Sequence, residues 1–254
     1  MMTILLDNIN SNDKSVFEPY KTELKYLCYE NNVYLMDNHL GATWCWIKSC
    51  LVHEEYGFIH IDRHLDLEKH DHCPKDSFQP ITDSEISIQD YLNLSWTLFG
   101  SNPIKCFQWN NYILNCKEFY PQWFRPGVFI TEERPSLNYT GFSFYQSQEI
   151  FSLLHECFNL NKKWIVNIDL DYFFMGDNYD DNDSDKIVFC YMESTIHDLM
   201  SVFSSNRDKI QVLTIALSPE CCGGLQHSLN VLKIMSDIIP ELKPMVINLC
   251  SHSI

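Results

Sequence analysis

Short apolar runs alternate with longer amphipathic stretches along this chain. The apolar runs, which are often rich in β-branched residues, predict strands over residues 33–36, 58–61, 128–131, 164–168, 212–217 and 245–249. Apolar positions at helical spacing predict helices over residues 41–55, 147–160, 191–204 and 225–239. Pro240 is expected to help end the last helix. The stretch 83–120 has no clear period.

This alternation of strands and helices predicts an α/β fold, in the form of a three-layer α/β/α sandwich with a mainly parallel sheet. Runs that are apolar at consecutive positions suit strands buried on both faces, as in a parallel sheet covered by helices. No low-complexity linker, proline-rich hinge or internal repeat divides the sequence. We therefore expect residues 1–254 to form a single domain.

The net charge of the chain indicates which classes of binding partner suit it. Its 254 residues include 18 Lys and Arg against 34 Asp and Glu, which gives a formal net charge of −16. So acidic a chain is poorly suited to neutralising phosphates, which argues against a nucleic-acid partner. Its field instead attracts cations, either metal ions or a basic substrate.

Neither a membrane span nor a secretory signal is expected. No apolar run reaches the roughly 18 residues that a spanning helix needs, and the apolar residues 1–6 are too few for a signal peptide. The 11 cysteines include no C-x-x-C pair, so the spacing of a zinc ribbon is missing. Reduced thiols in a chain of this length predict a cytoplasmic location.

Acidic residues and histidines follow directly after four of the predicted strands. They are Asp37 and His39 after the first, Asp62, His64 and Asp66 after the second, Asp169 and Asp171 after the fourth, and Glu220 after the fifth. In an open parallel sheet, ligands bind beyond the carboxyl ends of the strands. These side chains are therefore predicted to meet at one edge of the sheet.

The spacing within these motifs favours a metal centre. Alternate residues of an extended chain share a face, so Asp62, His64 and Asp66 project together, as do Asp169 and Asp171. Clustered carboxylates in an apolar setting need a cation. Four aspartates carry a charge of −4, which two divalent ions cancel. Carboxylate and imidazole ligands without a thiolate favour manganese over structural zinc. His60 shares this face but is expected to pack rather than to bind metal.

The order of these motifs resembles the manganese site of the arginase (ureohydrolase) superfamily. The resemblance implies an arginase/deacetylase-like fold and a single catalytic domain over residues 1–254. It assigns the ligands of one Mn²⁺ ion to His39, Asp62, Asp66 and Asp169, and those of the other to Asp62, His64, Asp169 and Asp171. Glu220, 49 residues after Asp171, matches the glutamate that receives the guanidinium group. The implied reaction is attack on the guanidinium carbon by a hydroxide that bridges the two ions.

Two stretches around the motifs are most similar to a divergent branch that contains peptide arginases. They are His-Ile-Asp-x-His-x-Asp-Leu at residues 60–67 and Asn-Ile-Asp-Leu-Asp-Tyr-Phe at residues 167–173. The loop that holds the ends of free arginine in other members is missing after Asp66. The resemblance therefore implies conversion of arginine to ornithine within a ribosomally made precursor peptide, with release of urea. Either His70 or His72 is the candidate that gives the leaving amine its proton.

Acidic residues near this edge would suit a basic peptide partner. Five aspartates lie in residues 176–185, and these are Asp177, Asp180, Asp181, Asp183 and Asp185. The segment lacks the glycine and glutamate that a hand-type calcium loop requires, so we expect a solvated loop. A surface that meets a basic partner is the other interpretation. Glu132 and Glu133 follow another predicted strand and add acid there. The sequence predicts no oligomeric state.

Other functions remain open at this point. The chain could be a ureohydrolase acting on a small free guanidine, such as arginine or agmatine, or an inert metal-containing module that binds peptides. Deacetylases share the fold but use one zinc ion, and the second set of ligands argues against them. The later motifs of metallophosphatases are missing. For Cys221 and Cys222, redox chemistry is less favoured than a close backbone turn at Gly223 and Gly224.

Overall fold

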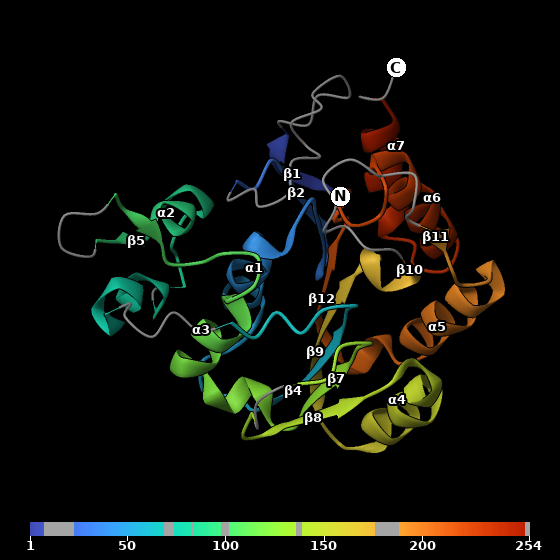
Figure 1. Ribbon diagram of the computed structural model, residues 1–254, viewed down its shortest axis with the longest axis horizontal. Helices are drawn as coiled ribbons and strands as arrows, with labels where there is room; N and C mark the ends of the chain where they lie inside the picture. The colour runs from blue at the N-terminus through green and yellow to red at the C-terminus, as the bar shows by residue number, and fades with distance from the viewer. Residues whose placement is uncertain are drawn as a thin grey trace.

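The computed structural model describes residues 1–7, 23–68, 74–82, 84–97, 102–135, 139–175 and 188–251. Within these residues, eight strands form one sheet in the order β1-β2-β3-β12-β9-β4-β7-β8 (Figure 1). Their bounds are β1 (Thr3–Asp7), β2 (Tyr26–Glu30), β3 (Val33–Met36), β4 (Tyr56–Ile61), β7 (Gly127–Ile130), β8 (Phe142–Tyr145), β9 (Lys163–Asp169) and β12 (Ile210–Ala216). Neighbouring strands from β3 to β8 are parallel, whereas the β1–β2 and β2–β3 pairs are antiparallel.

Helices cover both faces of this sheet. Figure 1 shows α4, α5, α6 and α7 on one face and α1 and α3 on the other. The helix bounds are α1 (Ala42–Ser49), α2 (Ile88–Asn93), α3 (Tyr112–Phe119), α4 (Ile150–Asn159), α5 (Glu193–Ser205), α6 (Leu225–Ser236) and α7 (Leu242–Ser251). Each face has its own cluster of buried apolar side chains. The predicted three-layer α/β/α sandwich with a mainly parallel sheet is therefore confirmed.

Short elements connect the main strands and helices. They are the 3₁₀ helices η2 (His39–Gly41), η3 (Lys75–Thr82), η4 (Pro121–Phe124), η5 (Ser147–Glu149), η6 (Leu170–Phe173) and η8 (Arg207–Lys209), with two small hairpins, β5 (Ser95–Trp96) with β6 (Ile104–Lys105) and β10 (Phe174–Met175) with β11 (Val188–Phe189). The stretch that had no clear period thus forms α2, β5, β6 and α3. In the described part of the chain, no helix is both long and apolar enough to cross a membrane.

The central strands are buried on both faces because their apolar residues are consecutive. Every residue of β3, β4 and β7 is buried. In β9, Trp164, Val166 and Ile168 join the cluster under α4 to α7, while Ile165 joins the cluster under α1 and α3. Successive side chains of the strand point to opposite faces of the sheet, so they pack into two separate cores.

One predicted strand is wrong, and several strands were missed. Residues 245–249 lie inside α7, not in the sheet. A short apolar run cannot be distinguished from a buried helical segment by its hydrophobicity alone. The buried positions of α7 are Leu242, Met245, Val246 and Leu249, which follow the period of a helix. The strands β1, β2 and β8 were not predicted. The predicted helix 41–55 ends at Ser49.

Candidate metal centre

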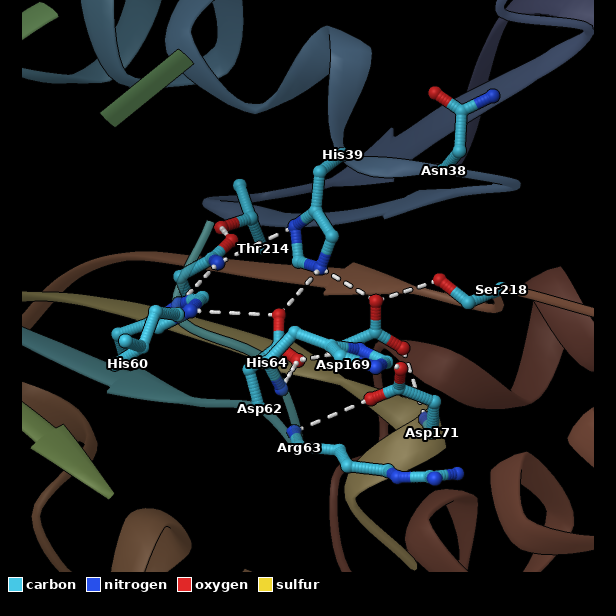
Figure 2. A network of polar contacts seen from close by, with 12 residues as sticks. Asn38, His39, His60, Asp62, Arg63, His64, Asp169, Asp171, Thr214 and Ser218 are labelled. Carbon is cyan, nitrogen blue, oxygen red and sulfur yellow. Dashed lines mark hydrogen bonds and ion pairs between the residues drawn. The ribbon is translucent and has the colours of Figure 1, made fainter. Parts of the chain in front are cut away.

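The polar strand ends meet because β3, β12, β9 and β4 are adjacent and parallel. Their carboxyl ends therefore lie at one edge of the sheet, as the sequence predicted. Figure 2 shows His39, Asp62, Asp169 and Ser218 reaching into one space from these four strand ends. The segments after β4 and β9 also bring in His64 and Asp171, which Figure 2 places beside them.

The two aspartate motifs turn sharply because their first carboxylates cap the backbone that follows. Oδ1 of Asp62 accepts a hydrogen bond from the backbone N–H of His64 at 2.6 Å. In the same way, Oδ1 of Asp169 accepts from the N–H of Asp171 at 2.8 Å. Such turns are a common local use of aspartate. Each motif thereby keeps its second carboxylate oxygen directed toward the space between the strand ends.

His39 and Asp66 are held by other local features. Asn38 caps η2, since its Oδ1 accepts from the N–H of Leu40 at 2.9 Å, and His39 is the first residue of that helix. Asp66 has a φ of 50°, in the left-handed region that aspartate tolerates better than most residues. Asp66 is also buried, with 7% of its surface exposed. The backbone therefore turns Asp66 inward at a sterically uncommon position.

Two overlapping groups of side chains are close enough to hold metal ions. One group is His39, Asp62 and Asp66, and the other is Asp62, His64 and Asp171. Within each group the candidate ligand atoms all lie within 4.8 Å of one another. Asp62 belongs to both groups. The Asp62 carboxylate is therefore placed where it could bind two neighbouring ions.

Asp169 joins the centre through His39. Its Oδ2 lies 2.7 Å from Nε2 of His39 and accepts a hydrogen bond from the hydroxyl of Ser218 at 2.6 Å. Nε2 of His39 is also 3.4 Å from Oδ2 of Asp62. On the other side, Nδ1 of His64 is 3.0 Å from Oδ2 of Asp171. All six predicted ligand residues thus surround one space.

The electrostatics of the centre are those of crowded, buried carboxylates. Burial raises the pKa of Asp62 well above its ordinary value, and the charges of Asp171 and Asp66 raise it further. Burial likewise raises the pKa of Asp66 to about 7 and also raises that of Asp169. A cluster of this kind binds protons or cations in order to relieve its own repulsion.

Burial acts on the pKa values of the imidazoles in the opposite direction, but neighbouring carboxylates outweigh it at His39 and His64. Burial lowers the pKa of His39, but the adjacent Asp169 carboxylate outweighs it and leaves this pKa well raised. Burial also opposes the charged form of His64, yet its bond with Asp171 brings the pKa to about 10. For Asp171, the same contact outweighs burial and lowers its pKa. Without metal, these imidazoles carry the positive charge of the site.

The residues present fit a pair of divalent ions. Asp62 is only 1% exposed, yet its Oδ2 has no hydrogen-bond partner among the described residues. This oxygen faces the space between the strand ends, where a cation would satisfy it. The donors are carboxylate oxygens and imidazole nitrogens, a set that suits manganese or a similar ion. Whether these residues bind metal, and which metal, stays a prediction.

Glu220 lies beyond β12 at the same edge of the sheet. It is half-buried, and burial raises its pKa to about 8. The carboxylates of Asp169 and Asp171 contribute to this shift. The turn that carries Glu220 continues through Gly223 and Gly224, with φ values of 76° and 126°. These angles confirm that the two glycines provide a turn that other residues would strain.

Cys221 and Cys222, within that turn, are both free thiols. None of the ten cysteines that the structure describes forms a disulfide. Burial raises the pKa of both Cys221 and Cys222 well above the ordinary value. Thiols held protonated in this way are poor nucleophiles. The turn therefore favours the backbone role that the sequence suggested for this stretch.

Some predicted residues lie outside the described part of the chain. These are the proton-transfer candidates His70 and His72, and the acidic residues Asp177, Asp180, Asp181, Asp183 and Asp185. Their roles stay predictions. The nearby Glu133 has a structural contact, since its Oε2 accepts from the backbone N–H of Leu65 at 3.1 Å. This bond ties the segment after β7 to the segment after β4.

Sequence reasoning missed a polar layer beneath the metal centre. Asn167, Thr214 and Tyr112 are fully buried and hydrogen-bonded to one another or to His39. The available signal was a polar residue inside each of two apolar strand runs. His60 packs between Phe58 and Phe129, as expected of a core residue. It also lies 3.3 Å from Asp62, whose face of the chain it shares as the alternation predicted.

Comparison with known proteins gives only distant structural likenesses. No protein-family model matches the chain, and no curated protein matches it. Among solved structures, it is similar to an Entamoeba histolytica arginase in complex with L-ornithine, with a TM-score of 0.45 and 12% identity. The match covers 89% of this chain and 73% of the arginase. The function proposed below rests on the side chains of the centre, not on this likeness.

Proposed function

We propose that this chain is a two-metal hydrolase that converts arginine side chains of a peptide to ornithine and releases urea. The observation that carries the proposal is the pair of candidate ligand groups that share Asp62 at the carboxyl ends of three parallel strands, β3, β4 and β9. The order of the ligand motifs in the sequence, with its resemblance to ureohydrolases, supplies the reaction class. The two arguments are independent, since one is geometric and the other is a pattern of residue types.

In this proposal, the six ligand residues divide between two ions. His39, Asp62, Asp66 and Asp169 would hold one ion, and Asp62, His64, Asp169 and Asp171 would hold the other. Two divalent ions held there would supply a water of lowered pKa, a nucleophile near neutral pH. The protein contributes a buried and preorganised set of carboxylates, whose charge of −4 matches the two ions. The hydrogen bonds that the Asp62 and Asp169 carboxylates accept from the backbone of the turns that follow would hold these side chains in place before any ion binds.

Glu220 is the residue proposed to bind the guanidinium group. A carboxylate and a guanidinium form a charge-assisted, planar pair that fixes both distance and orientation. Such a pair would place the guanidinium carbon over the centre and lower the entropy cost of attack. Burial and the charges of neighbouring aspartates raise the pKa of Glu220. A bound guanidinium is positively charged and favours the ionised form of the Glu220 carboxylate. Substrate binding would therefore lower the pKa of Glu220 and form an ion pair.

The proton for the leaving amine comes, in this proposal, from His70 or His72. Both follow the Asp62-x-His64-x-Asp66 motif within a few residues. A histidine is suited to the step because its pKa lies near the working pH. Each is tested by replacement with alanine, which should lower turnover without changing the number of ions bound.

A peptide substrate is supported by charge and by what the sequence lacks. The net charge of −16 attracts arginine-bearing peptides over distances beyond direct contact. The loop that holds the carboxylate and amine of free arginine in other ureohydrolases is missing after Asp66. A substrate whose ends are already in peptide bonds does not need those contacts. Manganese and a cytoplasmic location belong to the same proposal.

The deciding experiment is mass spectrometry of an arginine-containing peptide incubated with the manganese-loaded protein, beside free arginine and agmatine. Loss of one cyanamide unit per converted residue, with matching urea, supports the proposal. Reaction of free arginine or agmatine alone would support the small-molecule alternative. Metal and peptide binding without any product would support the inert module. The Asp171→Ala variant, run in parallel, shows whether any product depends on the centre.

A further inference from the structure

A row of three polar side chains crosses the sheet directly beneath the candidate ligands. His60 on β4 pairs in register with Asn167 on β9, and Asn167 pairs in register with Thr214 on β12. All three residues are 0% exposed. His60 and Asn167 stand two residues before Asp62 and Asp169, so each shares the face of its aspartate. The row therefore forms a layer between the α1–α3 core and the centre.

The hydrogen bonds of this layer fix the orientation of the Asn167 amide. The indole N–H of Trp46 can only donate, and it donates to Oγ1 of Thr214 at 3.2 Å. The hydroxyl of Thr214 then gives its own proton to Oδ1 of Asn167 at 2.7 Å. The carbonyl of the amide is thereby engaged on the Thr214 side. Its NH₂ group must face the opposite side, toward the imidazoles.

The NH₂ group of Asn167 has three polar atoms within reach. They are Nδ1 of His60 at 2.9 Å, the hydroxyl oxygen of Tyr112 at 3.0 Å and Nδ1 of His39 at 3.3 Å. Its two N–H groups donate along the two shorter contacts. The hydroxyl of Tyr112 in turn lies 3.0 Å from Nδ1 of His39. Figure 2 shows this network of dashed lines between Thr214 and the two histidines. Every donor in the chain from Trp46 to Tyr112 thus has an acceptor, as buried polar groups require.

This arrangement decides which nitrogen of His60 carries a proton. Because Nδ1 accepts from an amide that can only donate there, the proton of the ring lies on Nε2. Nε2 lies 3.3 Å from Oδ2 of Asp62. Among the described residues neither atom has a hydrogen-bond partner, so a proton on Nε2 and this carboxylate oxygen can satisfy each other. His39 is less constrained, since the hydroxyl of Tyr112 both donates and accepts and so tolerates either tautomer. The amide therefore fixes His60 while leaving His39 free to serve as a ligand.

We propose that His60 and Asn167 are positioning residues of the metal centre, with Asn167 holding His60 as the tautomer whose Nε2–H donates to Asp62. The proposal rests on the metal site of the proposed function but not on its substrate. Asp62 is the carboxylate common to both ligand groups. A carboxylate oxygen has two lone pairs, so Oδ2 can accept from His60 and still face an ion.

Two other roles for His60 make different predictions. As a further ligand, His60 would need a bare Nε2, which the donation from Asn167 to Nδ1 excludes. As a mere packing residue between Phe58 and Phe129, His60 could be replaced by phenylalanine without effect on metal binding. Hydrogen bonds to metal ligands typically change metal affinity about 10- to 100-fold when they are lost. The three roles are therefore distinguishable by tautomer and by affinity.

The first test is ¹⁵N NMR of the metal-free, full-length chain labelled at histidine. The expected spectrum has His60 protonated at Nε2 and bare at Nδ1, assigned by comparison with the His60→Phe variant. Replacing Asn167 with aspartate, which accepts where the amide donated, should move the proton to Nδ1. A wild-type chain protonated at Nδ1 of His60 would overturn the proposal. This readout needs neither metal nor activity.

The second test measures Mn²⁺ affinity by following free Mn²⁺ with electron paramagnetic resonance. His60→Phe keeps an aromatic ring but no donor and should weaken binding about 10- to 100-fold. His60→Gln keeps an N–H donor and should recover part of that loss. Unchanged affinity in a folded His60→Phe chain would refute positioning. If His60→Phe does not fold, Asn167→Asp is compared with the wild type in the same titration, and unchanged affinity there has the same meaning.

The outcomes separate this inference from the proposed function. A wild-type chain that binds no Mn²⁺ overturns both the two-metal function and the positioning role. A chain that binds Mn²⁺ but converts no peptide overturns the function and leaves the positioning role to be decided by the two variants. Full activity with equal affinities in wild type and His60→Phe overturns the inference alone.

Discussion

Nε2 of His39 lies 2.7 Å from Oδ2 of Asp169, although 130 positions separate the two residues in the chain. The contact exists because β3 and β9 both pair with β12 in parallel, so their carboxyl ends meet at the same edge. His39 follows one strand end and Asp169 ends the other. The same arrangement brings Asp62, His64, Asp66 and Asp171 to this edge.

Replacing Asp171 with alanine should abolish turnover and remove one ion per chain. Asp171 completes only the group that contains His64, so the ion held by His39, Asp62 and Asp66 should remain. The loss of activity should exceed the about 10- to 100-fold typical of changes outside the ligand set. Metal per chain is measured by elemental analysis after dialysis. Asp198→Ala, at an exposed side chain on α5, is the matched control and should bind both ions. Full activity of Asp171→Ala would contradict the two-metal assignment.

Without metal, the protein should lose stability as the pH rises from about 6 to 8. The folded pKa values of Asp66 and Glu220, about 7 and 8, lie above the ordinary carboxyl values, and that of His64, about 10, lies above the ordinary imidazole value. Between its ordinary and folded pKa, each group binds a proton in the folded state that the unfolded chain has released. The folded state therefore binds more protons, and its stability falls with rising pH. Thermal unfolding in the presence of a chelator at pH 6 and pH 8 measures this, and a higher melting temperature at pH 8 would contradict it.

Adding Mn²⁺ should stabilise the protein more at pH 8 than at pH 6. Metal ligands must release their protons, so ions compete with protons for the same carboxylates and imidazoles. Ion at about 100 times its dissociation constant contributes about 2.7 kcal/mol to folding. In Asp62→Asn the shared ligand is weakened, and most of this gain should disappear. The measurement is the melting temperature with and without Mn²⁺ at pH 6 and at pH 8. An equal gain in wild type and Asp62→Asn would argue that the ions bind elsewhere.

Replacing Glu220 with glutamine should impair the reaction but not the metal content. Glutamine keeps the size of the side chain and removes the charge that pairs with a guanidinium. A charge-assisted hydrogen bond contributes about 1.5–3 kcal/mol, so kcat/KM should fall roughly 10- to 150-fold. Steady-state kinetics on the arginine peptide measure the loss, with elemental analysis beside them. The nearby Glu133→Gln variant, whose side chain bonds the Leu65 backbone, serves as comparison. Unchanged kinetics in Glu220→Gln would exclude Glu220 as the guanidinium-binding group.

Replacing Gly57 with alanine should destabilise the sheet beneath the centre. Gly57 on β4 pairs with Trp164 on β9, and a Cβ atom there would lie 2.3 Å from Cε3 of the indole ring. Trp164 is fully buried, so the ring has little room to move. Overpacking of this kind costs about 1–3 kcal/mol. Urea unfolding measures the loss. The double variant Gly57→Ala with Trp164→Leu should be less destabilised than the sum of the two single variants, and strict additivity would argue against a clash.

The sequence determined the class of fold because consecutive apolar residues in β3, β4 and β9 can be buried only between two layers. It also determined the candidate ligands, since motifs such as Asp62-x-His64-x-Asp66 are local and their spacing survives any tertiary arrangement. It could not distinguish a buried strand from a buried helix at residues 245–249, because both are apolar and short. The strands β1, β2 and β8 were also missed. β1 and β8 are edge strands without a fully buried residue, and β2 is buried at only three of its five positions.

Only the tertiary structure decided which residues support the centre. Asn167 and Thr214 are single polar residues within apolar runs, and nothing in either run reveals that strand register places them side by side. Tyr112 comes from the stretch that had no clear period, yet its hydroxyl reaches His39. The sequence could supply the candidate ligands because their pattern is short-range. It could not supply the layer beneath them, because that layer is made by residues from separate elements whose contact depends on the order of strands in the sheet.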